Sequence, residues 1–206
     1  MIEQRVYALE EVRVEANADT GERRLSWYPA VFDSLSEDLG GFRERIGRRA
    51  FTQTIQEDDI RGLINHDPSL VIGRNKASTL SLRVDLKGLR AEAVLPDTQY
   101  ARDLATLVER GDVTGGSFAF MVRSDNWHYE DDVLIRELRD VRLFDASVVT
   151  YPAYPETNGS VSLRSLGPTA DYLERIISGL RPEPVKPASD IHAARRRQLE
   201  LARLRT

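Results

Sequence analysis

Residues 79–96 have the sequence TLSLRVDLKGLRAEAVLP. Apolar and polar residues alternate on both sides of the central Lys87-Gly88 pair. The alternating apolar residues are Leu80, Leu82, Val84, Leu89, Ala91 and Ala93. A two-residue period indicates strands that each bury one face, and a glycine between them favours a tight turn. We therefore predict a β-hairpin over these residues.

The same alternation recurs on both sides of this hairpin. It is present in RVYALEEVRV (5–14), RRLSWYPAV (23–31), DVTGGSFAFMV (112–122) and DVLIRELRDVRLFDASVVTYP (132–152). Many short strands at this spacing are typical of a closed barrel or a sandwich, and closure also removes exposed strand edges. The sequence therefore predicts a mainly β domain over residues 1–166.

Helices are predicted at a few places around these strands. Residues 98–110 have an apolar face at helical spacing, with Thr98 as a candidate N-cap and Gly111 as a C-terminal stop. A shorter helix is predicted over residues 43–56. Residues 167–180 form an amphipathic pattern, and residues 181–206 are a Pro-rich linker followed by a basic tail.

Composition excludes several classes of function. The chain has no cysteine and only three histidines, so disulfides, a thiol nucleophile, thiolate metal sites and a histidine-rich metal site are not expected. The net charge is -4, and the basic excess lies in residues 181–206, so we expect no nucleic-acid requirement. We see neither a signal-peptide core nor a membrane span, and we expect a cytoplasmic protein without a membrane role.

His66 is a candidate general base. It follows the apolar pair Leu63-Ile64 and precedes Asp67-Pro68, which favours a turn. A histidine at a strand end is held by the scaffold yet accessible, and imidazole exchanges protons near neutral pH. The alternative is a surface or half-buried histidine that bonds only to nearby backbone.

Ser117 is a candidate nucleophile. It follows two glycines and begins a strand in which Phe118 and Phe120 share one face, so that Ser117 and Ala119 share the other. Glycines leave room for a substrate backbone to approach the hydroxyl. A serine needs a base to become nucleophilic. The alternative is a glycine-rich bulge whose serine only satisfies a backbone group.

Asp145 is a candidate third member of a triad. It interrupts an apolar strand, where an unpaired carboxylate would be costly, and a histidine would be a suitable partner. The alternative is an ion pair with Arg139 or Arg142. Two other acids, Glu137 and Asp140, lie in a densely charged stretch that is typical of a solvated face.

Five segments resemble the phage prohead maturation proteases in the same order and at similar spacing. They are GFRERIGRRAF (41–51), LINHDPSLVIGR (63–74), GLRAEAVLPDT (88–98), VTGGSFAFMV (113–122) and LFDASVVTYPAYPET (143–157). The resemblance covers about residues 5–160. It implies a fold like that of the herpesvirus assembly proteases, a compact closed β-barrel with flanking helices, often dimeric.

The resemblance also implies roles for individual residues. Ser117 in GGSFAF matches the family's nucleophile, and His66 in NHD matches its base. Asp145 falls at the third position, where the phage enzymes often have glutamate. In the related herpesvirus enzymes, oxyanion donors follow the third member, which points here to a backbone N–H of Ala153 or Tyr154.

The activity implied is that of a serine endopeptidase that needs no metal or organic cofactor. It would cleave the major capsid protein, a scaffold protein and itself, inside the assembling procapsid in the host cytoplasm, and would act as a homodimer. The basic tail would tether the enzyme to scaffold or serve only as a solubilising helix. Two alternatives are a catalytically inert capsid-assembly scaffold or chaperone domain, and a different hydrolase that relies on His128 or Ser147.

Overall fold

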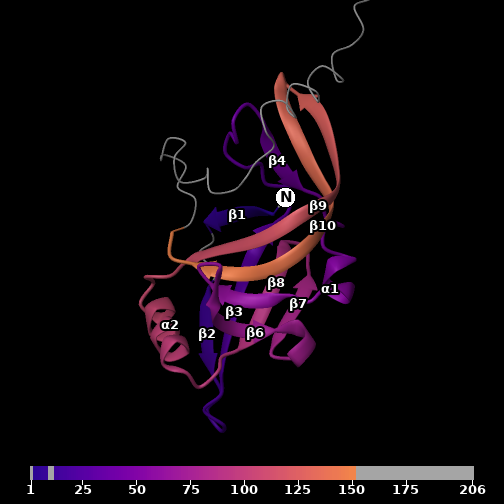
Figure 1. The fold of residues 1–206 in the computed structure, drawn as a ribbon. Coiled ribbons are helices and arrows are strands. Elements are labelled where there is room, and N and C mark those ends of the chain that lie inside the picture. Colours follow the sequence, from indigo (N-terminus) through magenta and orange to yellow (C-terminus); the bar gives the residue numbers. More distant parts are fainter. Residues whose placement is uncertain (1, 9–11, 152–206) are drawn as a thin grey trace, which may run out of the picture. The chain divides into compact units, whose positions relative to one another are not determined.

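The computed structural model describes residues 2–8 and 12–151 (Figure 1). Its elements are β1 (Glu3–Ala8), β2 (Arg13–Ala16), β3 (Arg23–Val31), β4 (Arg43–Ile46), α1 (Thr54–Glu57), β5 (Arg61–Ile64), β6 (Asp67–Arg74), the 3₁₀ turn η1 (Asn75–Ala77), β7 (Leu80–Val84), β8 (Gly88–Val94), α2 (Gln99–Glu109), β9 (Gly115–Glu130) and β10 (Val133–Val149). No helix in these two stretches is both long and apolar enough to cross a bilayer. The predicted domain boundary at 166, the amphipathic helix in 167–180 and the tail 181–206 lie outside the described residues.

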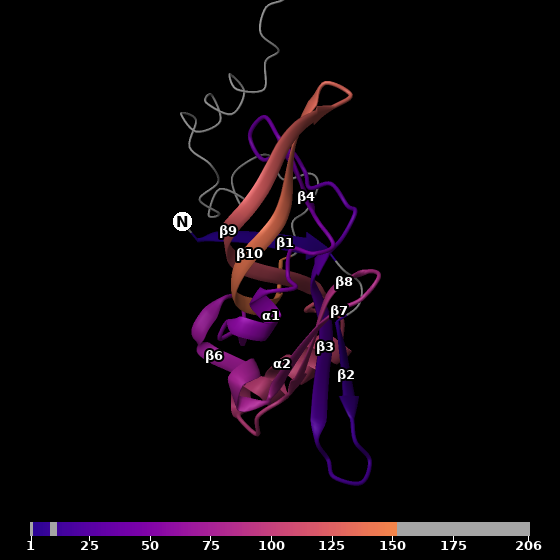
Figure 2. The same cartoon turned by 90° about the vertical axis from the view of Figure 1, so that its right-hand side faces the viewer.

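The strands form two sheets. The larger has the order β1-β9-β10-β5-β6, with β4 paired to a separate part of β10, and the smaller has the order β2-β3-β8-β7. Figures 1 and 2 show β9 and β10 as one long curved ribbon with β4 near its distal half. The mainly β class is confirmed. Within residues 2–8 and 12–151 neither sheet closes on itself, so the closed barrel is not confirmed.

The hairpin predicted over residues 79–96 is confirmed. β7 and β8 pair antiparallel, with Leu82 opposite Ala91. The Asp85 side chain closes the turn, because its Oδ1 accepts the backbone N–H groups of Lys87 and Gly88 at 2.8 and 3.1 Å. The turn therefore begins at Asp85, two residues earlier than the Lys87-Gly88 pair suggests.

The helix predicted over residues 98–110 is also confirmed, as α2. Its C-terminus is a Schellman motif. The N–H of Gly111 bonds to Val108 O at 3.0 Å, and the N–H of Asp112 bonds to Leu107 O at 2.8 Å. Gly111 has φ +82°, a conformation that glycine adopts without strain. Thr98 occupies the N-cap position, but its hydroxyl makes no capping hydrogen bond.

The helix predicted over residues 43–56 is wrong for most of its length. Arg43–Ile46 is the strand β4, which pairs in parallel with Ile135–Leu138 of β10. Phe42, Glu44 and Ile46 are buried in alternation, which is a strand period. Only Thr54–Glu57 is α-helical, because the parallel pairing and a following turn take up the earlier residues.

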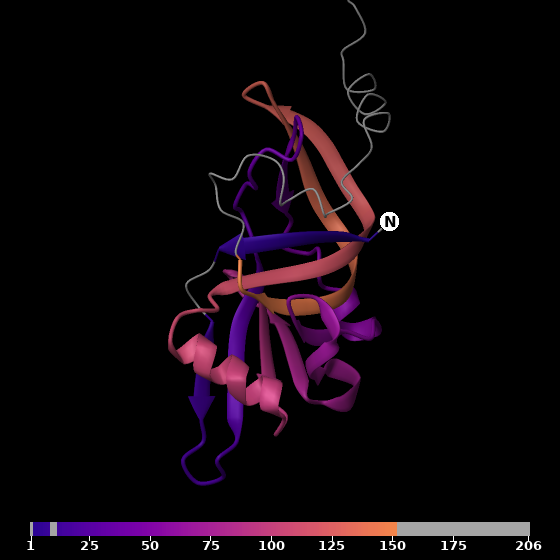
Figure 3. The same ribbon diagram turned by 60° about the vertical axis from the view of Figure 1, so that its left-hand side comes forward.

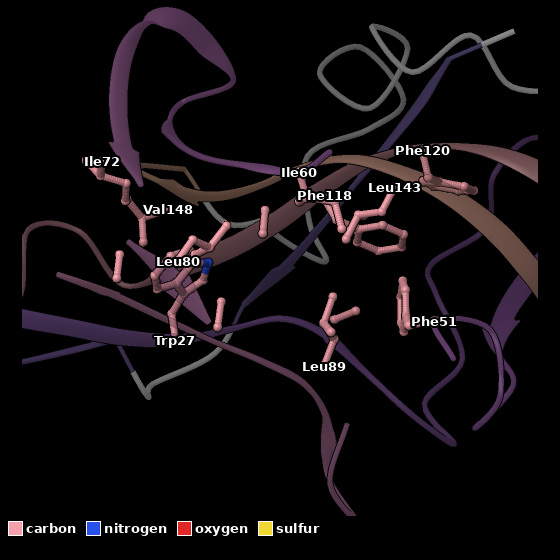
Figure 4. Close-up of a cluster of buried hydrophobic side chains, with 14 of the residues drawn as sticks. Trp27, Phe51, Ile60, Ile72, Leu80, Leu89, Phe118, Phe120, Leu143 and Val148 are labelled. Carbon is pink, nitrogen blue, oxygen red and sulfur yellow. The ribbon is translucent and has the colours of Figure 1, made fainter. Parts of the chain in front are cut away.

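The hydrophobic core lies between the two sheets and the segment that contains α1 (Figure 4). Phe118 and Phe120 from β9 stack with their ring centroids 4.7 Å apart, and Phe51 meets Phe118 edge-on at 5.5 Å. From the smaller sheet, Trp27 and Leu89 are fully buried in the same core. Each such side chain contributes about 1.5–3 kcal/mol by leaving water. The core therefore fixes the inner face of β9, where the two phenylalanines are predicted to point.

The two sheets are in close contact beside Gly116. A Cβ at this residue would lie 2.0 Å from the backbone oxygen of Tyr28 in β3. β3 has a bulge here, because an additional residue lies between the paired positions Trp27 and Ala30. The sequence suggests that the glycines before Ser117 admit a substrate backbone. At Gly116, however, the backbone of β3 occupies the space that a side chain would fill, so this space is not open to a substrate.

Five charged side chains form a buried cluster that joins β1, β4, β9 and β10. Arg5 bonds to Glu44 at 2.7 Å and to Glu3 at 2.7 Å. Arg136 bonds to Glu3 and Asp125, each at 2.8 Å, and also reaches Glu44 at 3.2 Å. Burial alone would lower the pKa of Arg136, but Glu3 and Glu44 outweigh it and the pKa is raised. Both arginines therefore stay charged, and the cluster fixes β1 against β9.

We predict that Glu44→Gln destabilises the fold by about 3–5 kcal/mol, because it leaves Arg5 and Arg136 buried with one carboxylate fewer. The matched control is Glu92→Gln, which removes a carboxylate from two partly exposed surface pairs and should cost less than about 1 kcal/mol. Chemical denaturation measures both. An equal loss in the two variants would mean that the buried cluster contributes no more than surface pairs do.

We predict that Gly116→Ala destabilises the fold by about 3 kcal/mol or more, because its methyl group would meet the backbone of Tyr28 rather than a movable side chain. Thermal and chemical unfolding of the variant measure the loss. A variant as stable as the natural chain would show that β3 can move away from β9 at little cost.

Candidate active site

The register of β9 and β10 places three polar side chains on one face. Ser117 lies opposite Ser147, and Ala119 lies opposite Asp145. Figure 3 shows β1, β9 and β10 side by side. Because alternate residues of a strand share a face, Ser117, Asp145 and Ser147 point away from the core side that Phe118 occupies. The two-strand ribbon therefore brings residues about thirty positions apart in sequence together.

A β-bulge decides which way Asp145 points. Leu143 pairs with Phe120 and Asp145 pairs with Ala119, so that Phe144 is an additional residue in β10. Such a bulge reverses the facing of the strand on its two sides. Leu143 thus points into the core with Phe120, whereas Asp145 faces the opposite side. Without the bulge, one of these two side chains would lie on the wrong face.

His66 reaches the same face from the turn between β5 and β6. Ile64 and Asp67 pair with each other, and the two residues between them, Asn65 and His66, have φ +51° and +58°. This is the pattern of a type I′ hairpin turn. The turn is therefore Asn65-His66 itself, two residues earlier than the predicted Asp67-Pro68, which instead begins β6. Asparagine and histidine tolerate this backbone region better than most residues.

Asn65 attaches this turn to the end of β10. Its N–H donates to Val148 O at 2.9 Å, and its Oδ1 accepts the N–H of Thr150 at 3.0 Å. Its side-chain amide also donates to the Thr150 hydroxyl at 3.2 Å. A non-glycine residue with positive φ costs on the order of 1–3 kcal/mol, which these bonds offset. The histidine backbone is thus fixed relative to the strand that contains Asp145.

The three predicted residues form one hydrogen-bonded chain. His66 Nε2 lies 2.6 Å from Ser117 Oγ, and His66 Nδ1 lies 2.7 Å from Asp145 Oδ1. A carboxylate can only accept a hydrogen bond, so Nδ1 carries a proton and its N–H group donates a hydrogen bond to Asp145. Nε2 is then left unprotonated and can accept the serine hydroxyl proton. The short side chain of aspartate spans the distance to His66 where related enzymes often use glutamate.

The Ser117 hydroxyl has a second acceptor within reach. It donates to the backbone oxygen of Arg5 in β1 at 2.7 Å. A hydroxyl has one proton, so it can serve either Nε2 or Arg5 O at a given moment. β1 pairs with β9, with Val6 opposite Ser117, and this register places the carbonyl there. The N-terminal strand therefore offers the Ser117 hydroxyl an alternative acceptor beside the imidazole.

The chain of residues is buried, with access at His66 and Asp145. Ser117 has no exposed surface, while the side chains of His66 and Asp145 are 12% and 11% exposed. A low local dielectric strengthens the hydrogen bonds between these groups. Solvent therefore reaches the site at the edges of His66 and Asp145, while Ser117 itself is covered.

The arginines and acids that could compete with the His66–Asp145 pair have other partners. Arg142 lies 3.7 Å from Asp58, and Arg139 bonds to Glu137 at 3.1 Å. Asp140 lies 3.9 Å from Arg123. The only ion pair that Asp145 makes within the described part of the chain is with His66. A structural pair between Asp145 and either arginine is therefore not present.

The alternative catalytic residues also have defined positions. His128 lies on the distal part of β9 and bonds to Glu130 at 3.1 Å and to Asn126 at 3.2 Å. Ser147 lies inside the site, but its hydroxyl donates to Asp145 Oδ1 at 2.6 Å. The two residues considered for the oxyanion, Ala153 and Tyr154, lie outside the described residues.

Sequence reasoning missed Asn65 as a residue of the site, and it considered Ser147 only as the lead residue of a different hydrolase. Asn65 is visible as a turn residue before a histidine, and an Asn at the first position of a two-residue hairpin is a known signal for a type I′ turn. Ser147 could be found from its spacing, since it is two residues from Asp145 and shares its strand face. Neither signal reveals that these side chains bond to Thr150 and Asp145.

The arrangement has the parts needed for nucleophilic acyl transfer. A serine hydroxyl is bonded to an imidazole nitrogen that can take its proton, and the imidazole is bonded on its other side to a carboxylate. This geometry activates a serine and stabilises the imidazolium that forms. The three groups come from β9, the β5–β6 turn and β10.

The chain is similar to a known family of proteins and to a solved structure. The profile described as Caudovirus prohead serine protease matches residues 10–171. Among solved structures, the bacteriophage T4 capsid assembly protease, gp21, is similar with a TM-score of 0.46 and 8% identity, over 73% of this chain and 99% of that one. No curated protein matches the sequence. The profile spans more than three quarters of the chain, which therefore belongs to the Caudovirus prohead serine protease family.

Proposed function

We propose that this protein is a serine endopeptidase in which Ser117, His66 and Asp145 act as the catalytic triad. The single observation that supports this most is the hydrogen bond of 2.6 Å between His66 Nε2 and Ser117 Oγ. It joins residues 51 positions apart in sequence, which a merely local role for either residue does not require. Family membership supports the same assignment.

In the proposed mechanism, Ser117 Oγ attacks the carbonyl carbon of a peptide bond while His66 Nε2 takes the hydroxyl proton. Asp145 accepts the Nδ1–H bond and stabilises the imidazolium. His66 then gives its proton to the leaving amine, and an ester to Ser117 remains. The same imidazole takes a proton from water, which attacks the ester carbonyl. His66 then gives that proton to Ser117 Oγ as it leaves, and the free carboxylic acid is released. No step uses a metal or an organic cofactor.

The proposed substrates are capsid and scaffold proteins, and also this chain itself. The support is the family, whose members are prohead serine proteases. The site of action would be the interior of the assembling procapsid. A homodimer stays a prediction from the resemblance, as does a role for the backbone of Ala153 or Tyr154 as oxyanion donor.

A catalytically inert scaffold or chaperone domain is the competing proposal. It would require Ser117 to point into the core or His66 to lie beyond bonding reach. The core-facing residue of this part of β9 is Phe118, and the measured distance favours the protease.

We predict that Ser117→Ala abolishes cleavage, with a loss on the order of 10⁶-fold in kcat, because the nucleophile is removed. The chain is co-expressed with capsid and scaffold proteins of the same phage, and cleavage is followed by mass spectrometry of the products. Ser81→Ala is the matched control, since Ser81 is exposed on β7 in the other sheet and should leave cleavage unchanged. Undiminished cleavage by the Ser117 variant would remove this residue from the mechanism.

We predict that Asp145→Asn lowers kcat by about 10⁴-fold while the protein remains folded. An amide can donate a hydrogen bond to Nδ1, which favours the tautomer whose Nε2 carries the proton and cannot accept that of Ser117. The measurement is the rate of cleavage beside the natural chain, with circular dichroism to check folding. An active, folded variant would mean that another group orients His66.

A further inference from the structure

We propose that Ser147 is a positioning residue of this site, which holds Asp145 and His66 in the arrangement that activates Ser117. The inference rests on the proposed function and extends it by one residue. Ser147 is fully buried, and its hydroxyl donates to Asp145 Oδ1 at 2.6 Å. Its Oγ also lies 3.3 Å from His66 Nδ1.

These three groups form a closed triangle of polar atoms. Asp145 Oδ1 accepts from both His66 Nδ1–H and the Ser147 hydroxyl. Because the hydroxyl proton points to the carboxylate, the lone pairs of Ser147 Oγ remain available to the Nδ1–H group. The Nδ1 proton is thus shared between a strong acceptor and a weaker one. Rotation of either the carboxylate or the imidazole would break one of these contacts.

The backbone gives Ser147 this place. β10 positions 145 and 147 share a face, and Ser147 is directly opposite Ser117 in β9. On the other side of β10, Ser147 pairs with Leu63 in β5. Leu63 lies two residues before the Asn65-His66 turn. A side chain between these three elements can fix their relative position. A small residue with one hydroxyl fits, since the site has no exposed surface at Ser147.

The charge of Asp145 strengthens the hydrogen bond that the Ser147 hydroxyl donates to it. A bond to an ionised acceptor is roughly twice as strong as a bond between neutral groups, and burial strengthens it further. A buried carboxylate that loses a donor is less well satisfied, and it can turn away from the imidazole to find another. Ser147 therefore acts on the reaction through Asp145 and does not touch the substrate.

The test uses steady-state cleavage of a peptide that spans a cleavage site mapped in the co-expression experiment. Ser147→Ala should lower kcat by about 10- to 100-fold with KM unchanged. Ser147→Cys fills nearly the same space with a weak donor and should show a loss of the same kind. Tyr28→Phe is the matched control, because it removes a hydroxyl that donates to the Asp85 carboxylate at 2.7 Å in the other sheet. It should leave kcat unchanged.

A second measurement needs no catalytic activity. Proton NMR detects the hydrogen-bonded Nδ1–H of His66, which resonates at low field when a carboxylate accepts it. Ser147→Ala and Ser147→Cys should shift or broaden this resonance, and Tyr28→Phe should not. If both Ser147 variants keep kcat within about twofold of the natural chain and leave the resonance in place, the proposal is overturned.

The two proposals fail in different ways. An inactive natural chain, or a Ser117→Ala variant that still cleaves, would contradict the proposed function, and the NMR resonance would then decide alone whether Ser147 positions His66. If the Ser147 variants lower kcat and also raise KM, while the resonance stays in place, Ser147 only supports folding and the positioning role is overturned. Loss of kcat at constant KM, with a moved resonance, supports the positioning role.

Discussion

The antiparallel pairing of β9 with β10 is the interaction on which the rest of the larger sheet depends. β1 pairs with β9, while β4 and β5 both pair with β10. The register of the ribbon sets Ser117 opposite Ser147, and the bulge at Phe144 turns Asp145 to the same face. A slip of one residue would exchange the core face with the polar face of either strand. The hydrophobic side chains of β9 therefore protect the geometry of the site.

The polar groups on this ribbon are buried because each one has partners. Ser117 bonds to His66 and to Arg5 O, and Ser147 bonds to Asp145. Farther along the ribbon, the buried cluster around Arg136 holds β1, whose register places that Arg5 carbonyl at the serine. Buried polar groups are costly when unpaired and give a unique geometry when satisfied. Catalysis and fold specificity thus use the same kind of interaction at two places on one pair of strands.

Much of the fold follows from local signals, and much of the site does not. The alternation in residues 79–96 and the glycine after α2 are local, so sequence predicts them. The parallel partner of Arg43–Ile46 lies 92 residues away, and no local pattern predicts it. Their residue types and local contexts make Ser117 and His66 candidates, and the resemblance to a family matches them to its nucleophile and base. The distances between them depend on the bulge at Phe144 and on a turn with two positive φ angles, which sequence periodicity does not reveal.

The central claim is that His66 makes the buried hydroxyl of Ser117 an unusually reactive nucleophile. The most direct measurement is reaction with a fluorophosphonate, in which the serine oxygen displaces fluoride from phosphorus, followed by peptide mapping of the labelled protein. The account predicts a single adduct on Ser117 that is lost when His66 is replaced by alanine. Labelling at another serine, or labelling of Ser117 that is equally fast without His66, would contradict it.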